Sequence, residues 1–240
     1  MITKRIDRLV EWTKWPAAWM AVAFSPFLLV AIANRIWESL DSPIYLVMFF
    51  AGLGFLWFAS RTSFANSFGT KLVFRWLHDA TQTFVSMLML HPVVSIRKND
   101  ASPELPRVRW LGKGNWIMLV SPYVFPLSTA VLWLVSLILF APLRSFVLGL
   151  GLGLHLCYVI YQAYEGTSEL RRLGKRFCWM FLPVANAAVV GLVFSFAIDG
   201  IDGVRDFLVD AITMPNRTWS WISGLLTGNT AGIGATLSKE

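Results

Sequence analysis

The sequence has few charged residues, few cysteines and no evident cleavable leader, and each shortage excludes a class of protein. Only 15% of its 240 residues are charged, whereas soluble domains have about 25%, so an ordinary soluble domain is not expected. Its two cysteines, Cys157 and Cys178, lie in separate apolar segments and are interpreted as small buried hydrophobes rather than a disulfide or a metal pair. The first apolar run lacks a small-x-small cleavage site and is expected to remain as a membrane anchor.

Apolar residues make up 56% of the chain and are concentrated in long blocks. The six blocks are Ala17–Ile36, Pro43–Ser60, Leu72–Ile96, Trp116–Leu143, Ser145–Tyr164 and Phe177–Ile198. A helix needs about 20 mostly apolar residues to cross the hydrocarbon core of a bilayer, and several blocks meet that length. The sequence therefore predicts an all-α, multi-pass membrane protein with five to six transmembrane helices.

Positive charge is placed in short runs between the apolar blocks, although the net charge is +7. This placement favours cytoplasmic loops that face anionic lipid headgroups, and no nucleic-acid partner is expected. The basic runs 97–113 and 171–176 are separated by two blocks, so both can lie on the cytoplasmic side. The N-terminus is also basic, which conflicts with six full spans. Either one early block is re-entrant, with Leu72–Ile96 as the candidate, or packing overrides the charge rule.

Two segments differ from the apolar blocks. Val93–Arg97 and Arg107–Leu111 alternate in polarity around a turn and predict a short membrane-associated β-hairpin. After Ile198, four aspartates define an acidic, amphipathic tail that ends with the short segment Trp219–Leu226, and both parts are expected to be interfacial helices. These changes predict three regions: 1–71 with two membrane helices, a membrane core 72–198, and the interfacial tail 199–240.

Polar residues within the apolar blocks are the candidate site, because an ionisable group in a membrane helix indicates function. In His78-Asp79-Ala80-Thr81-Gln82, His78 and Gln82 are one helical turn apart and share a face. This is the spacing of H-E-x-x-H, in which two histidines hold zinc and the glutamate activates water. His91 and His155, taken alone, are expected to form hydrogen bonds with neighbouring helices, and the Gly149/Gly153 pair is expected to admit another helix at close range.

The order of motifs after this helix strengthens the comparison. A predicted hairpin follows, then a block with Pro122-Tyr123-Val124-Phe125-Pro126, then a block with His155, and then Glu169. In this order the chain resembles small bacterial members of the site-2-protease-like membrane zinc metallopeptidases. The resemblance covers about residues 72–198, and the P-Y-x-F-P motif is its most specific element.

The resemblance implies a site but also shows departures from it. His78 matches the first zinc histidine, Asp79 stands at the general-base glutamate, Gln82 replaces the second zinc histidine, and Glu169 replaces an aspartate ligand. A glutamine offers only a neutral amide oxygen to zinc, and the shorter Asp79 is badly placed for proton transfer. These departures argue against bound zinc and against efficient hydrolysis.

Three functions follow as hypotheses. The first is a catalytically degenerate, metalloprotease-like protein of the bacterial cytoplasmic (inner) membrane, which acts as a scaffold, adaptor or regulator and binds a transmembrane partner. The second is an active, divergent intramembrane zinc protease that uses His78, Glu169 and His155 with Asp79 as base. The third is a channel or transporter subunit in which the same polar residues line an ion or proton path.

Overall fold

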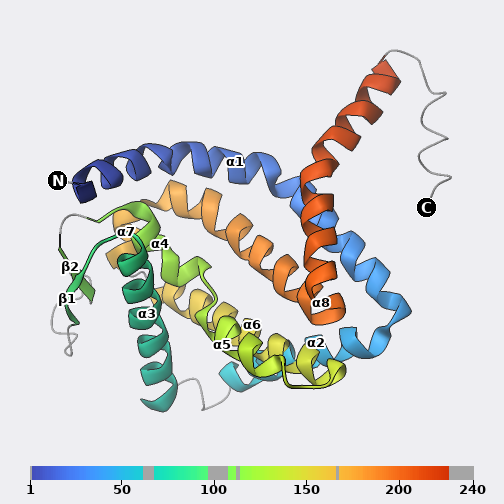
Figure 1. The fold of residues 1–240 in the computed structure, drawn as a ribbon, viewed down its shortest axis with the longest axis horizontal. Coiled ribbons are helices and arrows are strands. Elements are labelled where there is room, and N and C mark those ends of the chain that lie inside the picture. Colours follow the sequence, from blue (N-terminus) through green and yellow to red (C-terminus); the bar gives the residue numbers. More distant parts are fainter. Residues whose placement is uncertain (1, 62–67, 97–107, 112–113, 166–167, 227–240) are drawn as a thin grey trace.

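The computed structural model describes residues 2–61, 68–96, 108–111, 114–165 and 168–226 (Figure 1). Within these ranges the chain forms eight α-helices, one short 3-10 helix and one two-stranded sheet. The elements are α1 (Ile2–Glu38), η1 (Ser39–Asp41), α2 (Pro43–Arg61), α3 (Phe68–Leu88), β1 (Val93–Ile96), β2 (Val108–Trp110), α4 (Trp116–Val124), α5 (Leu127–Ser136), α6 (Ala141–Glu165), α7 (Ser168–Leu173) and α8 (Lys175–Leu226).

Several helices are suited to a lipid environment. By length and composition, three segments could cross a membrane: Arg5–Asp41, Ala141–Ala163 and Lys175–Asn216. A fourth span is possible if the bent pair α4 and α5 counts as one, and α2 contains a shorter apolar helix. The structure thus agrees with the prediction of a helical protein with membrane-spanning segments. The finer prediction of five to six spans stays a prediction.

The backbones of α2 and α6 approach each other closely at glycine residues. Gly149 of α6 lies so close to the carbonyl group of Phe49 on α2 that a Cβ atom would not fit between them. Gly52 of α2 has the same relation to the carbonyl group of Phe146. Small residues of this kind let helix backbones approach closely in membranes. The expected close approach at Gly149 and Gly153 is therefore confirmed, and α2 is the helix that approaches.

The block predicted as Trp116–Leu143 is broken in the structure. α4 and α5 are bent by 50° relative to one another, and the break contains Phe125 and Pro126. Pro126 has no N–H group and restricts the residue before it, so it favours a break in the helix. The amide N–H of Leu127 donates to the carbonyl oxygen of Phe125 rather than continuing the helical pattern.

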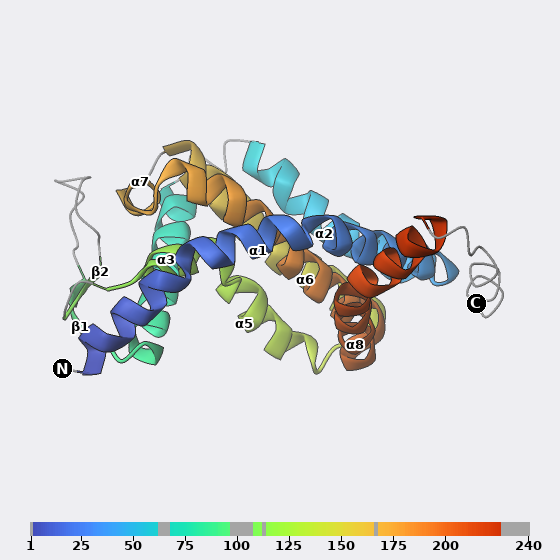
Figure 2. The same cartoon turned by 90° about the horizontal axis from the view of Figure 1, so that it is seen from above.

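The predicted hairpin is present at the end of the molecule away from the C-terminal part of α8 (Figure 2). β1 and β2 pair antiparallel, with Val93 opposite Trp110 and Ile96 opposite Val108. The connection 97–107, which carries much of the basic charge assigned to the cytoplasmic side, lies outside the described residues, as does Lys113.

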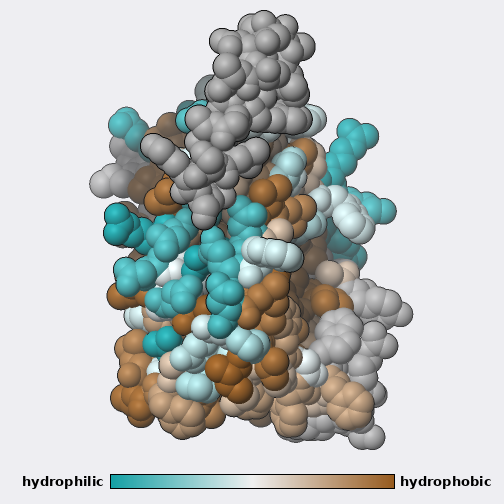
Figure 3. All heavy atoms as spheres, turned by 90° about the vertical axis from the view of Figure 1, so that its right-hand side faces the viewer, coloured by the Kyte–Doolittle hydropathy of each residue, from teal (hydrophilic) through white to brown (hydrophobic). Residues whose placement is uncertain are grey.

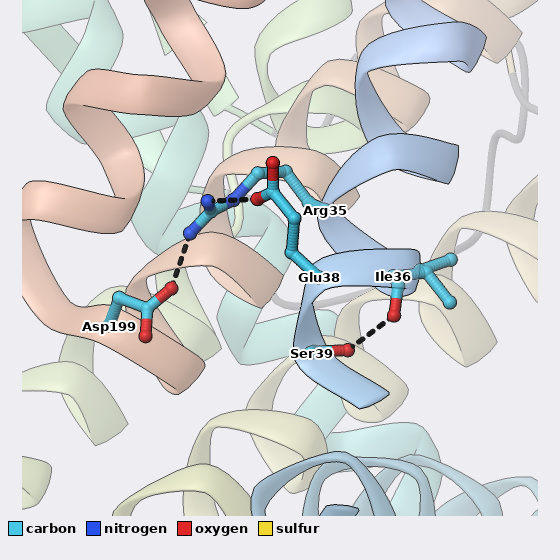
Figure 4. A network of polar contacts seen from close by, with 5 residues as sticks. All are labelled: Arg35, Ile36, Glu38, Ser39 and Asp199. Carbon is cyan, nitrogen blue, oxygen red and sulfur yellow. Dashed lines mark hydrogen bonds and ion pairs between the residues drawn. The ribbon is translucent and has the colours of Figure 1, made fainter. Parts of the chain in front are cut away.

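The last helix, α8, continues beyond the predicted end of the span at Ile198. It changes direction at Gly200, whose φ of 68° lies in the region that favours glycine. Beside this kink the buried Arg35 of α1 makes ion pairs with Glu38 and with Asp199 (Figure 4). The surface at this end of the molecule combines a hydrophilic area with hydrophobic side chains below it (Figure 3).

Candidate functional site

One face of α3 carries the polar residues of the degenerate motif into the protein interior. His78 is 5% exposed, Thr81 2% and Gln82 0%. Hydrophobic neighbours Phe74, Leu77 and Val85 are buried beside them, whereas Trp76 and Phe84 are exposed. Because an α-helix has 3.6 residues per turn, these polar and apolar residues share one face of α3, and that face is buried.

The buried histidine meets two side chains from distant parts of the chain. Its Nδ1 lies 2.5 Å from the hydroxyl oxygen of Tyr158 on α6. Its Nε2 lies 3.9 Å from Oε1 of Glu169 on α7, and Glu169 is itself 4% exposed. The expected convergence of His78 and Glu169 is therefore observed, and Tyr158 joins them. These three residues and Gln82 are called the His78 cluster below.

Tyr158 is the residue of this cluster that the sequence analysis did not include. It lies three positions after His155, so one turn of α6 presents both side chains to the same side. Its ring stacks with that of Tyr123 at a centroid distance of 6.3 Å, and Tyr123 lies 6.0 Å from the His78 ring. Two features of the sequence could have indicated Tyr158: its three-residue spacing from His155, and the presence of an aromatic partner, Tyr123, within P-Y-x-F-P. Tyr123 also shows that the P-Y-x-F-P segment packs against the cluster.

The Gln82 side chain has no hydrogen-bond partner among the described residues, and neither does the hydroxyl of the adjacent Thr83. Neither Oε1 nor Nε2 is paired, although the residue is wholly buried. By contrast, the hydroxyl groups of Thr81 and Ser86 donate to backbone carbonyl oxygens one turn earlier. An unpaired buried amide costs about 1–3 kcal/mol. Native proteins contain few such groups, and each calls for an explanation.

His155 makes the contact with a neighbouring helix that its sequence context predicted. Its Nε2 donates to Oδ1 of Asn186 on α8 across 3.1 Å. The Asn186 amide nitrogen donates in turn to the carbonyl oxygens of Tyr123 and Leu182, at 3.0 and 2.9 Å. The Tyr123 carbonyl precedes the break between α4 and α5, so Asn186 supplies a donor where the helix no longer does. His155 and Asn186 therefore have a structural role: they join α6 and α8 to the end of α4.

His91 is also tied to a neighbouring helix, as predicted. Its Nε2 lies 3.1 Å from Oδ2 of Asp7 on α1, and its Nδ1 lies 2.8 Å from the carbonyl oxygen of Met89. The second carboxylate oxygen of Asp7 accepts a hydrogen bond from Asn115. Asp79, at the predicted general-base position, is partly buried, and its catalytic role stays a prediction.

The residues present provide two of the donors that a zinc site needs. Two ligands on a tetrahedral zinc, with bonds of about 2.0–2.1 Å, would be roughly 3.3 Å apart, whereas His78 Nε2 and Glu169 Oε1 are 3.9 Å apart. A catalytic zinc takes three protein ligands, and the third position of the motif is the amide Gln82. Across the described ranges, no three His, Cys, Asp or Glu side chains form a group that could hold a metal ion. Gln82 is thus the departure in the donor set, and whether the protein binds zinc stays a prediction.

No protein-family model, curated protein or solved structure matches the chain. The relation to site-2-protease-like metallopeptidases therefore depends on the motifs and their order, and it remains a proposal.

Proposed function

We propose that the protein is a membrane scaffold or adaptor that binds a transmembrane partner at the His78 cluster, on a metallopeptidase-like core that has lost hydrolytic chemistry. The observation that carries the proposal is Gln82: a wholly buried amide with an unpaired donor and an unpaired acceptor. The cellular setting implied by the resemblance is the bacterial cytoplasmic membrane.

The chemistry of an amide suits recognition of a polypeptide better than activation of water. A glutamine side chain offers two N–H donors and a carbonyl acceptor, the same groups that a peptide unit presents. A partner segment with an irregular or polar position could satisfy them inside the membrane, where unpaired backbone groups are costly. Substituting an amide for a zinc histidine would then exchange a catalytic site for a binding site.

The proposal is tested by purifying the full chain in mild detergent and identifying membrane proteins that remain bound in fixed stoichiometry. Gln82→Leu should remove the partner, because it keeps the approximate volume but deletes the amide. Gln162→Leu, a partly buried glutamine on α6, is the matched control and should retain it. A photo-crosslinker at Gln82 should label the same protein. Equal retention by both variants would contradict the proposal.

Descent from a zinc enzyme can be tested on the same chain. Restoring Gln82→His together with Asp79→Glu should raise zinc bound by the purified protein toward one per chain, and adding His78→Ala should lower it again. If the wild-type chain already binds one zinc that His78→Ala removes, the scaffold proposal is wrong and the divergent-protease hypothesis takes its place.

A proton path is a second candidate function, favoured by the contact from His78 to the Tyr158 hydroxyl. Tyr158 also lines a small cavity with His155, Thr81 and Ser128, so polar groups continue past the cluster. Imidazole can accept a proton on one nitrogen and release one from the other. In liposomes, Glu169→Gln and Tyr158→Phe should abolish proton flux and Tyr161→Phe should not. Absence of flux in the wild-type chain would exclude this candidate.

A further inference from the structure

A small polar cavity lies between α3, α5 and α6, at the break after α4. Its volume is about 10 Å³, measured as the space open to the centre of a water molecule. Four of its lining residues are polar, namely Thr81, Ser128, His155 and Tyr158. All four are buried, with exposed fractions of 2–7%. A polar cavity of about 10–15 Å³ on this measure has room for one water molecule.

The first turn of α5 leaves buried hydrogen-bond donors beside this cavity. The first regular helical bond of α5 runs from the Ala130 N–H to the Pro126 carbonyl oxygen, and no side chain caps this helix start. The backbone N–H groups of Ser128 and Thr129 have no acceptor among the residues that the structure describes, and both residues are buried. Because buried backbone N–H groups are nearly always paired, with water where protein groups do not reach, an acceptor is expected here.

His155 has the opposite need, because one of its ring nitrogens is an acceptor without a donor. The Asn186 nitrogen donates to two carbonyl oxygens, so Oδ1 of Asn186 faces Nε2 of His155 and places the proton on that nitrogen. In the neutral ring Nδ1 is then an acceptor, and no described residue donates to it. The Thr81 hydroxyl donates to the Leu77 carbonyl oxygen and keeps its lone pairs for another donor. An unpaired donor and two available acceptors thus belong to residues that line one cavity.

We propose that this cavity binds one water molecule, which accepts a hydrogen bond from the Ser128 N–H and donates to Nδ1 of His155 and to the Thr81 hydroxyl oxygen. An anion would satisfy the N–H but not the two acceptors, and a metal cation would satisfy the acceptors but not the N–H. Water does both, and it joins α3, α5 and α6 where α4 and α5 separate. The site depends on neither proposed function, although Tyr158 in the same wall places the water where a proton path would need a link to His155.

The direct test is a structure of the full chain in lipid nanodiscs, at a resolution that shows ordered water. One peak is expected in the cavity, within about 2.7–3.2 Å of both the Ser128 nitrogen and Nδ1 of His155. An empty cavity would overturn the proposal. So would a peak that contacts neither of these atoms, or one with the density and coordination of an ion.

A second test counts water molecules that exchange slowly from the protein interior, by magnetic relaxation dispersion of water nuclei. Thr81→Leu fills the space and deletes an acceptor, so it should lower the count by one. Ser128→Thr adds only a methyl group to the cavity and serves as the second variant if Thr81→Leu fails to fold. Thr83→Leu, at a partly buried position of α3 that does not line the cavity, is the matched control and should leave the count unchanged. An unchanged count in both cavity variants would contradict the proposal. Gln82→Leu should keep the water, so this proposal and the partner proposal can fail separately.

Discussion

His78 and His91 are both buried histidines that face a carboxylate, but their surroundings differ. His91 lies 3.1 Å from the Asp7 carboxylate, and its other nitrogen lies 2.8 Å from a backbone carbonyl oxygen. Asn115 pairs with the second oxygen of Asp7. His78 lies 3.9 Å from Glu169, beyond hydrogen-bond distance, and Gln82 on the same helix face has an unpaired amide.

The difference separates a structural polar cluster from one that retains binding capacity. A fully paired buried network ties elements together, here α1 with the segment after α3, and its polar atoms have no further bond to make. A partly paired cluster costs stability, and natural proteins keep such costs mainly where function requires them. The location of a histidine in an apolar block does not distinguish these cases, whereas the pairing of its neighbours does.

The largest effect on stability is expected at His91. His91→Ala should leave the Asp7 carboxylate without its buried imidazole partner and lower the free energy of unfolding by about 3 kcal/mol. Unfolding in mixed detergent micelles, followed by tryptophan fluorescence, measures the change. His78→Ala is the matched variant and should cost about 1 kcal/mol. Similar losses of unfolding free energy in the two variants would contradict the distinction between the His91 and His78 surroundings.

A smaller loss of stability is expected at Asn186, whose side-chain oxygen and nitrogen both form hydrogen bonds. Asn186→Leu removes the donor to the Tyr123 carbonyl and the acceptor for His155, so the free energy of unfolding should fall by about 2 kcal/mol. Asn34→Leu, on α1, controls for adding a leucine to a helix and should change stability by less than about 0.5 kcal/mol. If Asn186→Leu is neutral, water rather than Asn186 satisfies the broken helix.

Part of this site could be predicted from the sequence because helical spacing and motif order are local. The i, i+4 relation of His78 and Gln82 and the later Glu169 were enough to expect one pocket. The contact of Tyr158 with His78 joins residues 80 positions apart and depends on how α6 packs, which no local pattern contains. The unpaired state of Gln82 depends on every neighbour at once.

The fold was predictable to a similar degree. The hairpin followed from alternating polarity and the Gly149 contact from the small-residue spacing. The break at Pro126 was missed because apolar residues continue on both sides of the proline, and hydrophobicity alone does not record a bend. The continuation of α8 past Ile198 was missed for the opposite reason: polarity changes there while the helix turns at Gly200 and goes on.

Gln82→Leu is expected to change the free energy of unfolding less than His91→Ala or Asn186→Leu does, and in the opposite direction. Deleting an unpaired buried amide should raise the free energy of unfolding by about 1 kcal/mol, while partner binding is lost. The same detergent unfolding measurement applies, with Gln162→Leu as the control. A destabilised Gln82→Leu protein would mean that the amide has a structural partner and that the His78 cluster is not different in kind from the His91 cluster.

The most direct comparison of the two histidines is a pair of coupling energies, of which the one at His78 is the smallest effect expected. A double-mutant cycle of Tyr158→Phe and His78→Ala isolates the hydroxyl–imidazole contact, and one of Asp7→Asn and His91→Ala isolates the carboxylate–imidazole contact. The first coupling should be about 0.5–1 kcal/mol, as for a neutral hydrogen bond, and the second about 1.5–3 kcal/mol, as for a bond to a charged group. The order matters more than the values, because a hydrogen bond to a neutral hydroxyl can be exchanged for one to an incoming group at little cost. If the Tyr158–His78 coupling exceeds the Asp7–His91 coupling, His78 is held for structure, and the binding role must be sought at Gln82 alone.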